Sequence, residues 1–491
     1  KRQGMGGWSE HGRDPLLHRT FGGLLWGKNF VREDSTSLRS AAAARQQRFA
    51  LHVLTKQTET VEEWRKAVVA LSDEARIDWD VALKAHRTWW REFWERSWIH
   101  LPAGDLFDID QGYLLQRYVT ACAGRGFSPI KFNGSIFTVD AQVGTQKLDA
   151  DYRRWGGAYW FQNTRLIYWP MLPSGDFEML EPLLRMYREA LPFATARTQT
   201  YFAHAGAFFP ETLYFWGSYP DDVYGWKREG LELGITENTF VRYYYDGALE
   251  LLAMMLDLYA HNHDERLVRE TVLPLAQAVL TFYDLHYPRD SQGRLWLVPA
   301  QALETWQTAV NPLPPLAGLH AVLSALLALP PGLASEAERE SWGELQAILP
   351  EVPKAKQQDG EVLVAAEELL EDALNSENPE LYAIFPYRLF GVGKPDLQMA
   401  RRTFQKRRVK GNDGWRQDDI QAAWLGLAAE ASERLRARAK MRNPEQRFPA
   451  FWGPNYDWTP DQDHGSNLLL ALQAMLLQAD GRTRLRRRPG R

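Results

Sequence analysis

The 491-residue sequence contains a single cysteine, Cys122. One cysteine excludes an intramolecular disulfide and a zinc site built from several thiolates. The sequence has no run of about 18 apolar residues, so we expect neither a transmembrane helix nor a membrane partner. It also lacks a glycine-rich phosphate-binding loop and the strand–helix alternation that is typical of a parallel α/β fold.

Neither sign of charge predominates. Lysine plus arginine number 58 and aspartate plus glutamate number 62, which gives a formal net charge of −4. A protein that contacts phosphates of nucleic acid needs a basic surface, so we expect no nucleic-acid partner. Hydrophobic residues make up 45% and charged residues 24%, a composition typical of a globular protein rather than a disordered one.

Aromatic side chains are abundant instead, with 20 tryptophans, 19 tyrosines and 22 phenylalanines. They cluster in residues 89–98, 155–169, 214–216 and 452–458. Tryptophan and tyrosine have flat apolar faces and a polar edge, which suit the C–H faces and hydroxyls of sugars. Core packing is the more common role of any single tryptophan. Several clusters beside carboxylates and amides nevertheless favour a carbohydrate cleft.

Helical periodicity dominates from about residue 76. Apolar residues recur at helical spacing in ten segments, namely residues 83–94, 114–122, 179–190, 251–259, 268–282, 316–327, 362–374, 397–404, 420–435 and 468–477. Residues 48–54 show strand-like alternation and residues 58–71 a helical pattern. We therefore interpret residues 1–75 as the tail of an upstream β-rich domain plus a helical linker.

This pattern predicts a mainly α fold. About ten helices of roughly 10–20 residues, joined by long aromatic loops, favour helix hairpins arranged as an (α/α)6 toroid over residues 76–480. The loops at one end of such a ring would hold the functional residues. A helical solenoid is the competing architecture, but no fixed sequence period supports it.

Glu304 is the candidate general acid. It lies in a loop-like stretch before the proline-rich residues 311–315, between Leu303 and Trp306. We expect these neighbours to desolvate the carboxyl partly, which raises its pKa and keeps a proton on it near neutral pH. An exposed loop glutamate is the alternative.

Asp463 is the candidate general base, because it precedes the helical pattern of residues 468–477. The N–H groups at a helix start stabilise an ionised carboxylate, which is the state a base requires. An N-cap aspartate is the alternative. Asn163 follows an aromatic stretch, and its amide can bond to a water or a sugar hydroxyl, or to its own backbone in a turn.

Two carboxyls on opposite faces of a sugar, roughly 6.5–9.5 Å apart, are what an inverting glycosidase uses. Such an enzyme needs neither a cofactor nor a metal. We expect the substrate-binding residues to be aromatic or histidine side chains, namely Trp160, Trp169, Trp216, Trp306, Trp415, Trp458, His204 and His464.

Several segments, taken in order over roughly residues 80–480, resemble glycoside hydrolase family 95. This is a family of α-L-fucosidases and α-L-galactosidases with an (α/α)6 barrel. Residues 157–170 are similar to its segment with two water-binding asparagines. Asn163 falls on the second asparagine, and Phe161 occupies the place of the first. Residues 390–424 are similar to its late Gly-Trp-x-x-x-Trp region, with a different spacing.

Residues 463–478 are similar to the stretch that contains the general base of that family. The resemblance therefore implies this role for Asp463, and Glu304 falls near the family's general acid. The family's histidine-rich segment is replaced at residues 377–382. A related but distinct six-hairpin family is expected, and L-fucose is not implied as the sugar.

The sequence thus predicts an inverting, exo-acting glycoside hydrolase with an oligosaccharide or polysaccharide substrate. Two alternatives stay open. A polysaccharide lyase would pair Tyr244 or Tyr245 with His204 to remove a proton beside a uronate. A non-catalytic carbohydrate-binding protein would have the aromatic cleft without two opposed carboxyls.

The two ends of the chain bear on its location in the cell. The sequence begins Lys1-Arg2-Gln3, without an initiator methionine or the apolar segment of a signal peptide. We expect a fragment or processed product with any targeting signal upstream, and a secreted or periplasmic enzyme. The arginine-rich residues 481–491 are expected to form a solvated tail.

Overall fold

The computed structural model describes most of the chain, namely residues 1–10, 14, 16–75, 79–102, 104–136, 142–143, 146–147, 152–442 and 461–479. The expected basic tail lies outside these residues. The chain divides into two compact units, one of residues 6–98 and one of residues 1–5 with 99–491. This division falls later than the domain boundary that we expected near residue 75. None of the described helices combines the length and the apolar character needed to span a bilayer.

The smaller unit contains two strand pairs and two helices, which are β1 (Arg19–Gly27), β2 (Phe30–Arg32), β3 (Leu38–Ser40), β4 (Phe49–Gln57), α1 (Val61–Ala75) and α2 (Trp79–Arg96). β1 and β4 pair in antiparallel register, and α1 packs against both. Gly22 makes this packing possible, because a Cβ there would lie 2.8 Å from the Trp64 ring. The strand and helix predicted at residues 48–54 and 58–71 correspond to β4 and α1.

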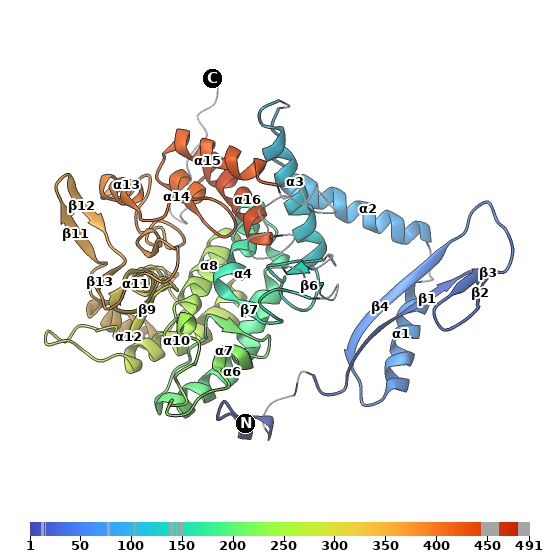
Figure 1. Ribbon diagram of the computed structural model, residues 1–491, viewed down its shortest axis with the longest axis horizontal. Helices are drawn as coiled ribbons and strands as arrows, with labels where there is room; N and C mark the ends of the chain where they lie inside the picture. Colours follow the sequence, from blue (N-terminus) through green and yellow to red (C-terminus); the bar gives the residue numbers. More distant parts are fainter. Residues whose placement is uncertain are drawn as a thin grey trace. The chain divides into compact units, whose positions relative to one another are not determined.

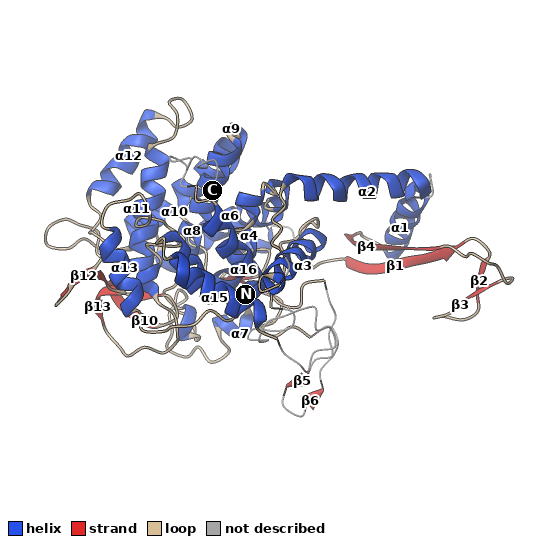
Figure 2. Cartoon of the chain, turned by 90° about the horizontal axis from the view of Figure 1, so that it is seen from above, coloured by secondary structure: helices blue, strands red, loops and turns tan. Residues whose placement is uncertain are grey.

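The larger unit is mainly helical and has two layers of helices (Figures 1 and 2). Its inner layer consists of segments that are largely buried, namely α4 (Phe161–Tyr168), α8 (Gly247–Asn262), α11 (Leu313–Leu327), the 3-10 helix η5 (Pro379–Leu381), α14 (Asp418–Trp424) and α16 (Gln462–Leu476). The outer layer consists of α3 (Phe107–Ala123), α6 (Glu181–Phe202), α10 (Leu273–His286), α12 (Glu336–Ala347), α13 (Leu397–Lys406) and α15 (Ala428–Lys440).

Composition explains why α11 lies inside and α12 outside. A helix that is apolar on all sides must be covered on all sides, whereas an amphipathic helix keeps one face in water. α11 contains no charged residue and is mostly buried. α12 contains four glutamates and one arginine and buries Trp342 and Leu345. The same contrast separates α8 from α13.

The inner segments close a ring. α4 contacts α8, α8 contacts α11, α11 contacts η5, α14 contacts α16, and α16 returns to α4. A cluster of buried side chains that includes Leu381, Ala422 and Ala474 joins η5, α14 and α16. Each inner segment follows one outer helix along the chain, so the ring is built of helix hairpins. The predicted mainly α (α/α)6 toroid is confirmed.

A buried arginine ties three inner segments together. Arg165 of α4 pairs with Glu250 of α8, with Nη1 2.6 Å from Oε1. Its Nη2 donates to the Tyr382 hydroxyl, 2.7 Å away, directly after η5. Because a buried charge without its partner is costly, this contact fixes the relative positions of the three segments.

The connections between helices contain short elements, namely α5 (Met171–Ser174), α7 (Asp221–Tyr224), α9 (Glu265–Leu267), η2 (Phe177–Met179), η3 (Thr239–Val241), the π-helix η4 (Val268–Val272), β5 (Gln142–Val143), β6 (Gln146–Lys147), β7 (Tyr159–Trp160), β8 (Thr212–Leu213), β9 (Ala300–Ala302), β10 (Trp306–Pro312), β11 (Lys354–Gln357), β12 (Gly360–Leu363) and β13 (Ala366–Leu369). β10 is the central strand of a three-stranded sheet with β9 and β13. This sheet holds the turn that contains Glu304.

Two helical predictions were wrong. Residues 362–374 do not form a helix but contribute to β12 and β13, because β13 pairs with β10 and tertiary pairing overrides a local helical pattern. Residues 420–435 form two helices instead of one. The break lies at Gly426, whose φ of +67° is a conformation that favours glycine and ends a helix.

Candidate active site

The candidate site lies where the first residues of several inner segments meet. Asn163, in the first turn of α4, donates from Nδ2 to Oδ2 of Asp463, in the first turn of α16, over 2.5 Å. Gln162 accepts a hydrogen bond of 3.4 Å from the Tyr244 hydroxyl, which lies just before α8. These contacts join distant parts of the chain, so the N-terminal ends of α4, α8 and α16 share one end of the ring.

Asp461, and not Asp463, caps α16. Its Oδ1 accepts from the backbone N–H groups of Asp463 and His464, at 3.1 and 3.3 Å. The cap therefore leaves the Asp463 side chain available to meet Asn163. Asp463 is fully buried and lies in the first helical turn of α16.

Local structure explains why Asn163 faces the interior. β7 pairs with β8 and delivers the chain to the start of α4. Glu211, directly before β8, accepts from the backbone N–H of Gln162 over 3.0 Å and so caps α4. Burial raises the pKa of Glu211 to about 7, while hydrogen bonds from Thr212 and Gln162 oppose this shift.

Glu304 lies in the turn between β9 and β10 and is half-buried. The preceding residue, Leu303, has a φ of +58°, a conformation that costs a leucine free energy. Leu303 is fully buried, and its packing holds the turn in place. The Glu304 carboxylate accepts a hydrogen bond from Asn375 Nδ2 to Oε2, 2.8 Å long.

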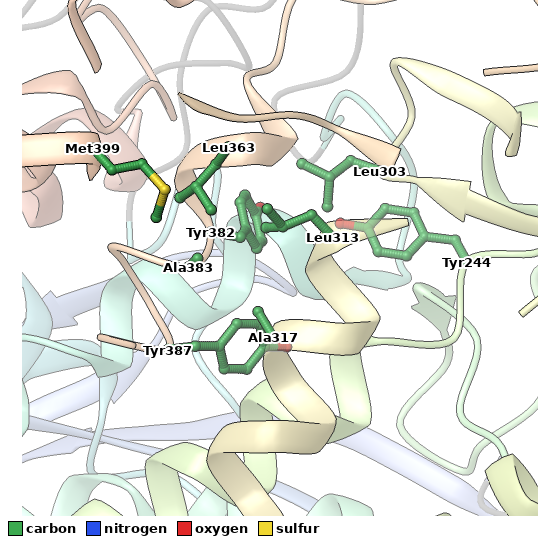
Figure 3. Close-up of a cluster of buried hydrophobic side chains, with 9 residues drawn as sticks. All are labelled: Tyr244, Leu303, Leu313, Ala317, Leu363, Tyr382, Ala383, Tyr387 and Met399. Carbon is green, nitrogen blue, oxygen red and sulfur yellow. The ribbon is translucent and has the colours of Figure 1, made fainter. Parts of the chain in front are cut away.

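The anchor of this turn is an apolar cluster that Figure 3 draws in full. Leu303 and Leu313 lie between the rings of Tyr382 and Tyr244. The other members come from α11, β12, α13 and the residues after η5, and are Ala317, Leu363, Ala383, Tyr387 and Met399. The cluster therefore connects the Glu304 turn to two residues whose hydroxyls bond to α4.

Glu377 is the functional candidate that the sequence interpretation missed. Its Oε2 accepts from Thr305 Oγ over 2.6 Å, and its backbone N–H donates to the same hydroxyl over 3.0 Å. Burial raises the pKa of Glu377 to about 7, the negative charge of Glu211 adds to the shift, and hydrogen bonds from Thr305 and Gln162 oppose it. Glu377 thus lies between Thr305, which follows Glu304, and Gln162, which precedes Asn163.

A signal for Glu377 was present in the sequence. Residues 377–382 replace the histidine-rich segment of the resembled family, and Glu377 is the first residue of that replacement. Buried ionisable groups with shifted pKa values concentrate at functional sites. The sequence pattern alone did not show that this glutamate would be buried.

Three of the predicted tryptophans lie in segments that adjoin the site. Trp160 is half-buried at the end of β7 and donates from its indole to the Trp155 carbonyl, 3.2 Å away. Trp306 is half-buried at the start of β10, with the Arg408 guanidinium 5.4 Å from its ring centre. Trp415 lines a small cavity beside Glu377.

The other predicted aromatic residues are placed differently. Trp169 is buried at the far end of α4 from Asn163, and its indole donates to Glu250 over 2.7 Å. Trp169 therefore packs between inner helices. Trp216 is half-buried and stacks on Tyr214 at a ring distance of 4.5 Å. Trp458 lies outside the described residues.

Neither predicted histidine contacts the Asn163–Asp463 pair through its ring in the described part of the chain. His464 is fully buried, with Nδ1 accepting from the Gly414 N–H at 3.2 Å and Nε2 bonded to the Arg438 carbonyl at 2.9 Å. Burial and the Arg438 charge hold the pKa of His464 well below its ordinary value, so it is neutral. His204 bonds to His286 instead, at the end of α6.

No cluster of histidine, cysteine, aspartate or glutamate suited to a metal ion occurs within the described ranges.

We expect the stability of the protein to fall as pH rises from about 5 to 8. Glu211, Glu377 and Glu380 have pKa values of about 7 in the folded chain, above their ordinary 4.5. The folded state therefore retains protons that the unfolded state has lost, and the stabilisation present below pH 4.5 is lost through pH 7. Calorimetry should show a Tm several degrees lower at pH 8 than at pH 5.

The variant Glu377→Gln provides the control for this pH dependence. It removes one of the three titrating carboxyls, so its Tm should fall less steeply between pH 5 and 8 than that of the wild-type protein. A wild-type Tm that rises over this range would contradict the prediction.

Comparison with known proteins bears on the fold. Residues 1–99 match the domain family DUF5703_N, described as a domain of unknown function. No curated protein matches the chain. A solved structure provisionally described as a kojibiose phosphorylase from the human microbiome has a TM-score of 0.62 at 11% identity. The match covers 94% of this chain and 64% of that one.

A second structure, described as a single-substitution variant of a glycosidase, has a TM-score of 0.49 at 16% identity, and the match covers 75% of this chain and 98% of that one. The chain spans about 64% of the length of the phosphorylase structure. At these identities the comparison with the phosphorylase structure supports the six-hairpin toroid.

Proposed function

We propose that the chain is an inverting, exo-acting glycoside hydrolase, with Asp463 as general base and Glu304 as general acid. The observation that supports this most directly is the 2.5 Å hydrogen bond between Asn163 and Asp463. It joins two residues that the sequence alone nominated, from positions 300 residues apart.

The chemistry of the pair suits the activation of water. The Asn163 Nδ2 donor fixes one oxygen of the Asp463 carboxylate, and the Asn163 carbonyl can accept from a water that Asp463 also holds. The carboxylate then takes a proton from this water as it attacks the anomeric carbon. Glu304 would donate its proton to the departing oxygen on the opposite face of the sugar.

The same aspartate favours water over phosphate as the nucleophile. The phosphorylase named above raises the possibility of phosphorolysis. A phosphate bound at the position of the attacking water would place its negative charge beside the buried Asp463 carboxylate. Two charges of like sign repel each other more strongly in a buried site than in bulk water. Hydrolysis needs no such approach of two anions.

The relationship to glycoside hydrolase family 95 is proposed as a distant one. Phe161, at the place of the first water-binding asparagine, is buried and its ring contacts Tyr187 at a centroid distance of 5.9 Å. It cannot hold a water by hydrogen bonds. The proposal therefore relies on Asn163 alone for that task and does not adopt L-fucose as substrate.

The lyase alternative is less favoured. Burial raises the pKa values of Tyr244 and Tyr245 well above the ordinary value, which makes either a poor base at neutral pH. Tyr244 bonds to Gln162 and His204 to His286. The tyrosine and the histidine that a lyase would pair are therefore engaged with different partners.

The test is a screen of neutral oligosaccharides and aryl glycosides, followed by proton NMR of the first product formed. We expect a product of inverted anomeric configuration and a rate that does not depend on added phosphate. Strict dependence on phosphate would indicate a phosphorylase, and an ultraviolet-absorbing product a lyase. Near-wild-type kcat in both Glu304→Gln and Asp463→Asn would overturn the residue assignment.

A further inference from the structure

A small polar recess lies between the residues around η5 and the start of α14. It has a volume of about 20 Å³, and its lining includes Glu377, Tyr382, Trp415, Gln417 and Gln421. This space accommodates about one water molecule or one hydroxyl group. We refer to these five residues as the Glu377 recess.

Two buried amide oxygens in the recess lack partners. Gln417 is 7% exposed and Gln421 is 4% exposed. The Oε1 atom of each has no hydrogen-bond partner within the part of the chain that the structure describes. A buried polar atom left without a partner costs roughly 1–3 kcal/mol. A bound group that donates hydrogen bonds would remove this cost.

Ion pairs satisfy the neighbouring charges but not Glu377. Asp418 pairs with Arg407 at 2.7 Å and with Arg434 at 3.4 Å. Arg416, which also lines the cavity, forms an ion pair with Asp413. Beside these ion pairs the lining holds the Glu377 carboxyl and the two glutamine oxygens, all of which can accept hydrogen bonds. Such a lining favours a neutral donor and disfavours a carboxylate.

The recess belongs to the same end of the ring as the catalytic pair. The side chain of Gln162, the residue before Asn163, lies close enough to Glu377 to lower the pKa of that carboxyl. On the other side, Asn467 of α16 donates from Nδ2 to the carbonyls of Gly414 and Arg416, which flank Trp415. The segments that hold Asn163 and Asp463 therefore also border the recess.

We propose that the Glu377 recess determines sugar specificity by taking the terminal hydroxyl of the exocyclic hydroxymethyl group of a neutral hexose. A hydroxymethyl group projects from the sugar ring, fits a narrow space, and both donates and accepts hydrogen bonds. A 6-deoxyhexose would leave the glutamine oxygens unsatisfied, and a uronate would face Glu377. This inference rests on the proposed function, because it places the sugar beside Asp463.

The test is calorimetric binding of matched sugars to the full chain. The probes are glucose, 6-deoxyglucose and glucuronate, and the corresponding galactose, fucose and galacturonate. In at least one trio, we expect the hexose to bind at least about tenfold more tightly than both counterparts, as the loss of one buried hydrogen-bonded group implies. Equal binding within both trios, or no binding by either hexose, would overturn the inference.

Variants of the recess separate specificity from stability. Gln421→Ala should reduce the preference over the 6-deoxy sugar to under about threefold, and Glu377→Gln should reduce the preference over the uronate. Gln346→Ala, a half-buried residue of the outer helix α12, is the matched control and should bind all sugars as the wild-type protein does. If the recess variants lower Tm but keep the wild-type preferences, the recess only holds a structural water.

These outcomes are distinct from failure of the proposed function. Should Glu304→Gln and Asp463→Asn retain full turnover, the hydrolase assignment fails while sugar preferences can still be measured. Should both abolish turnover while the recess variants leave all preferences unchanged, the specificity inference fails and the hydrolase assignment stands.

Discussion

Asp463→Asn is expected to lower kcat by roughly 10²–10⁴-fold, the usual contribution of a positioned general base. The substitution keeps the size of the side chain and removes its ability to accept a proton from water. KM should change little, because the proposed role of Asp463 is to act on the water and not to bind the sugar. The measurement is steady-state kinetics on the substrate that the screen identifies.

Azide provides a sharper version of this experiment. Azide attacks a sugar without losing a proton, so it does not need a base. In Asp463→Asn, added azide should restore turnover and give a glycosyl azide of inverted configuration. In Asn163→Ala the carboxylate remains but loses the 2.5 Å contact, so we expect a smaller loss of kcat.

The matched control is Asp290→Asn. Asp290 pairs with Arg294 at the surface, where an ion pair contributes little to stability. This variant should have wild-type kinetics. A loss of activity in Asp463→Asn that is accompanied by a lower Tm and is not rescued by azide would contradict a role as base and indicate a structural one.

The predictable part of the site consists of residues whose chemistry is visible locally. Asp463 was nominated because it precedes a helix, and Asn163 because it follows an aromatic stretch. The resemblance to glycoside hydrolase family 95 also points to both residues, and the structure brings the two together. The helical ring was predictable for a similar reason, because each helix shows its own periodicity in the sequence.

The unpredictable part depends on partners that are distant in sequence. Residues 366–369 look helical but pair with β10. Trp169 and His464 resemble ligand-binding side chains, yet Trp169 bonds to Glu250 and His464 to backbone groups. Glu377 becomes notable only once it is buried against Thr305 and Gln162. No local pattern encodes such contacts.

The competition between Glu304 and Glu377 for the role of general acid leads to the second large expected effect. Glu304 is half-buried and bonded to Asn375. Glu377 is buried, and its pKa of about 7 would also keep a proton near neutral pH. An acid must reach the leaving oxygen. The half-exposed Glu304 is better placed to do so than Glu377, whose carboxyl is buried and accepts a hydrogen bond from Thr305.

Glu304→Gln should therefore lower kcat/KM by roughly 10²–10⁴-fold for substrates with a sugar or alcohol as leaving group. Its activity on the matching glycosyl fluoride should fall by less than about tenfold, because fluoride departs without a proton from a carboxylic acid. Glu377→Gln should affect both substrates alike, through binding. The opposite outcome is that Glu377→Gln, and not Glu304→Gln, loses activity on the sugar or alcohol substrates while keeping activity on the fluoride. In that case the general acid is Glu377, and the proton of its carboxyl is the one used in catalysis.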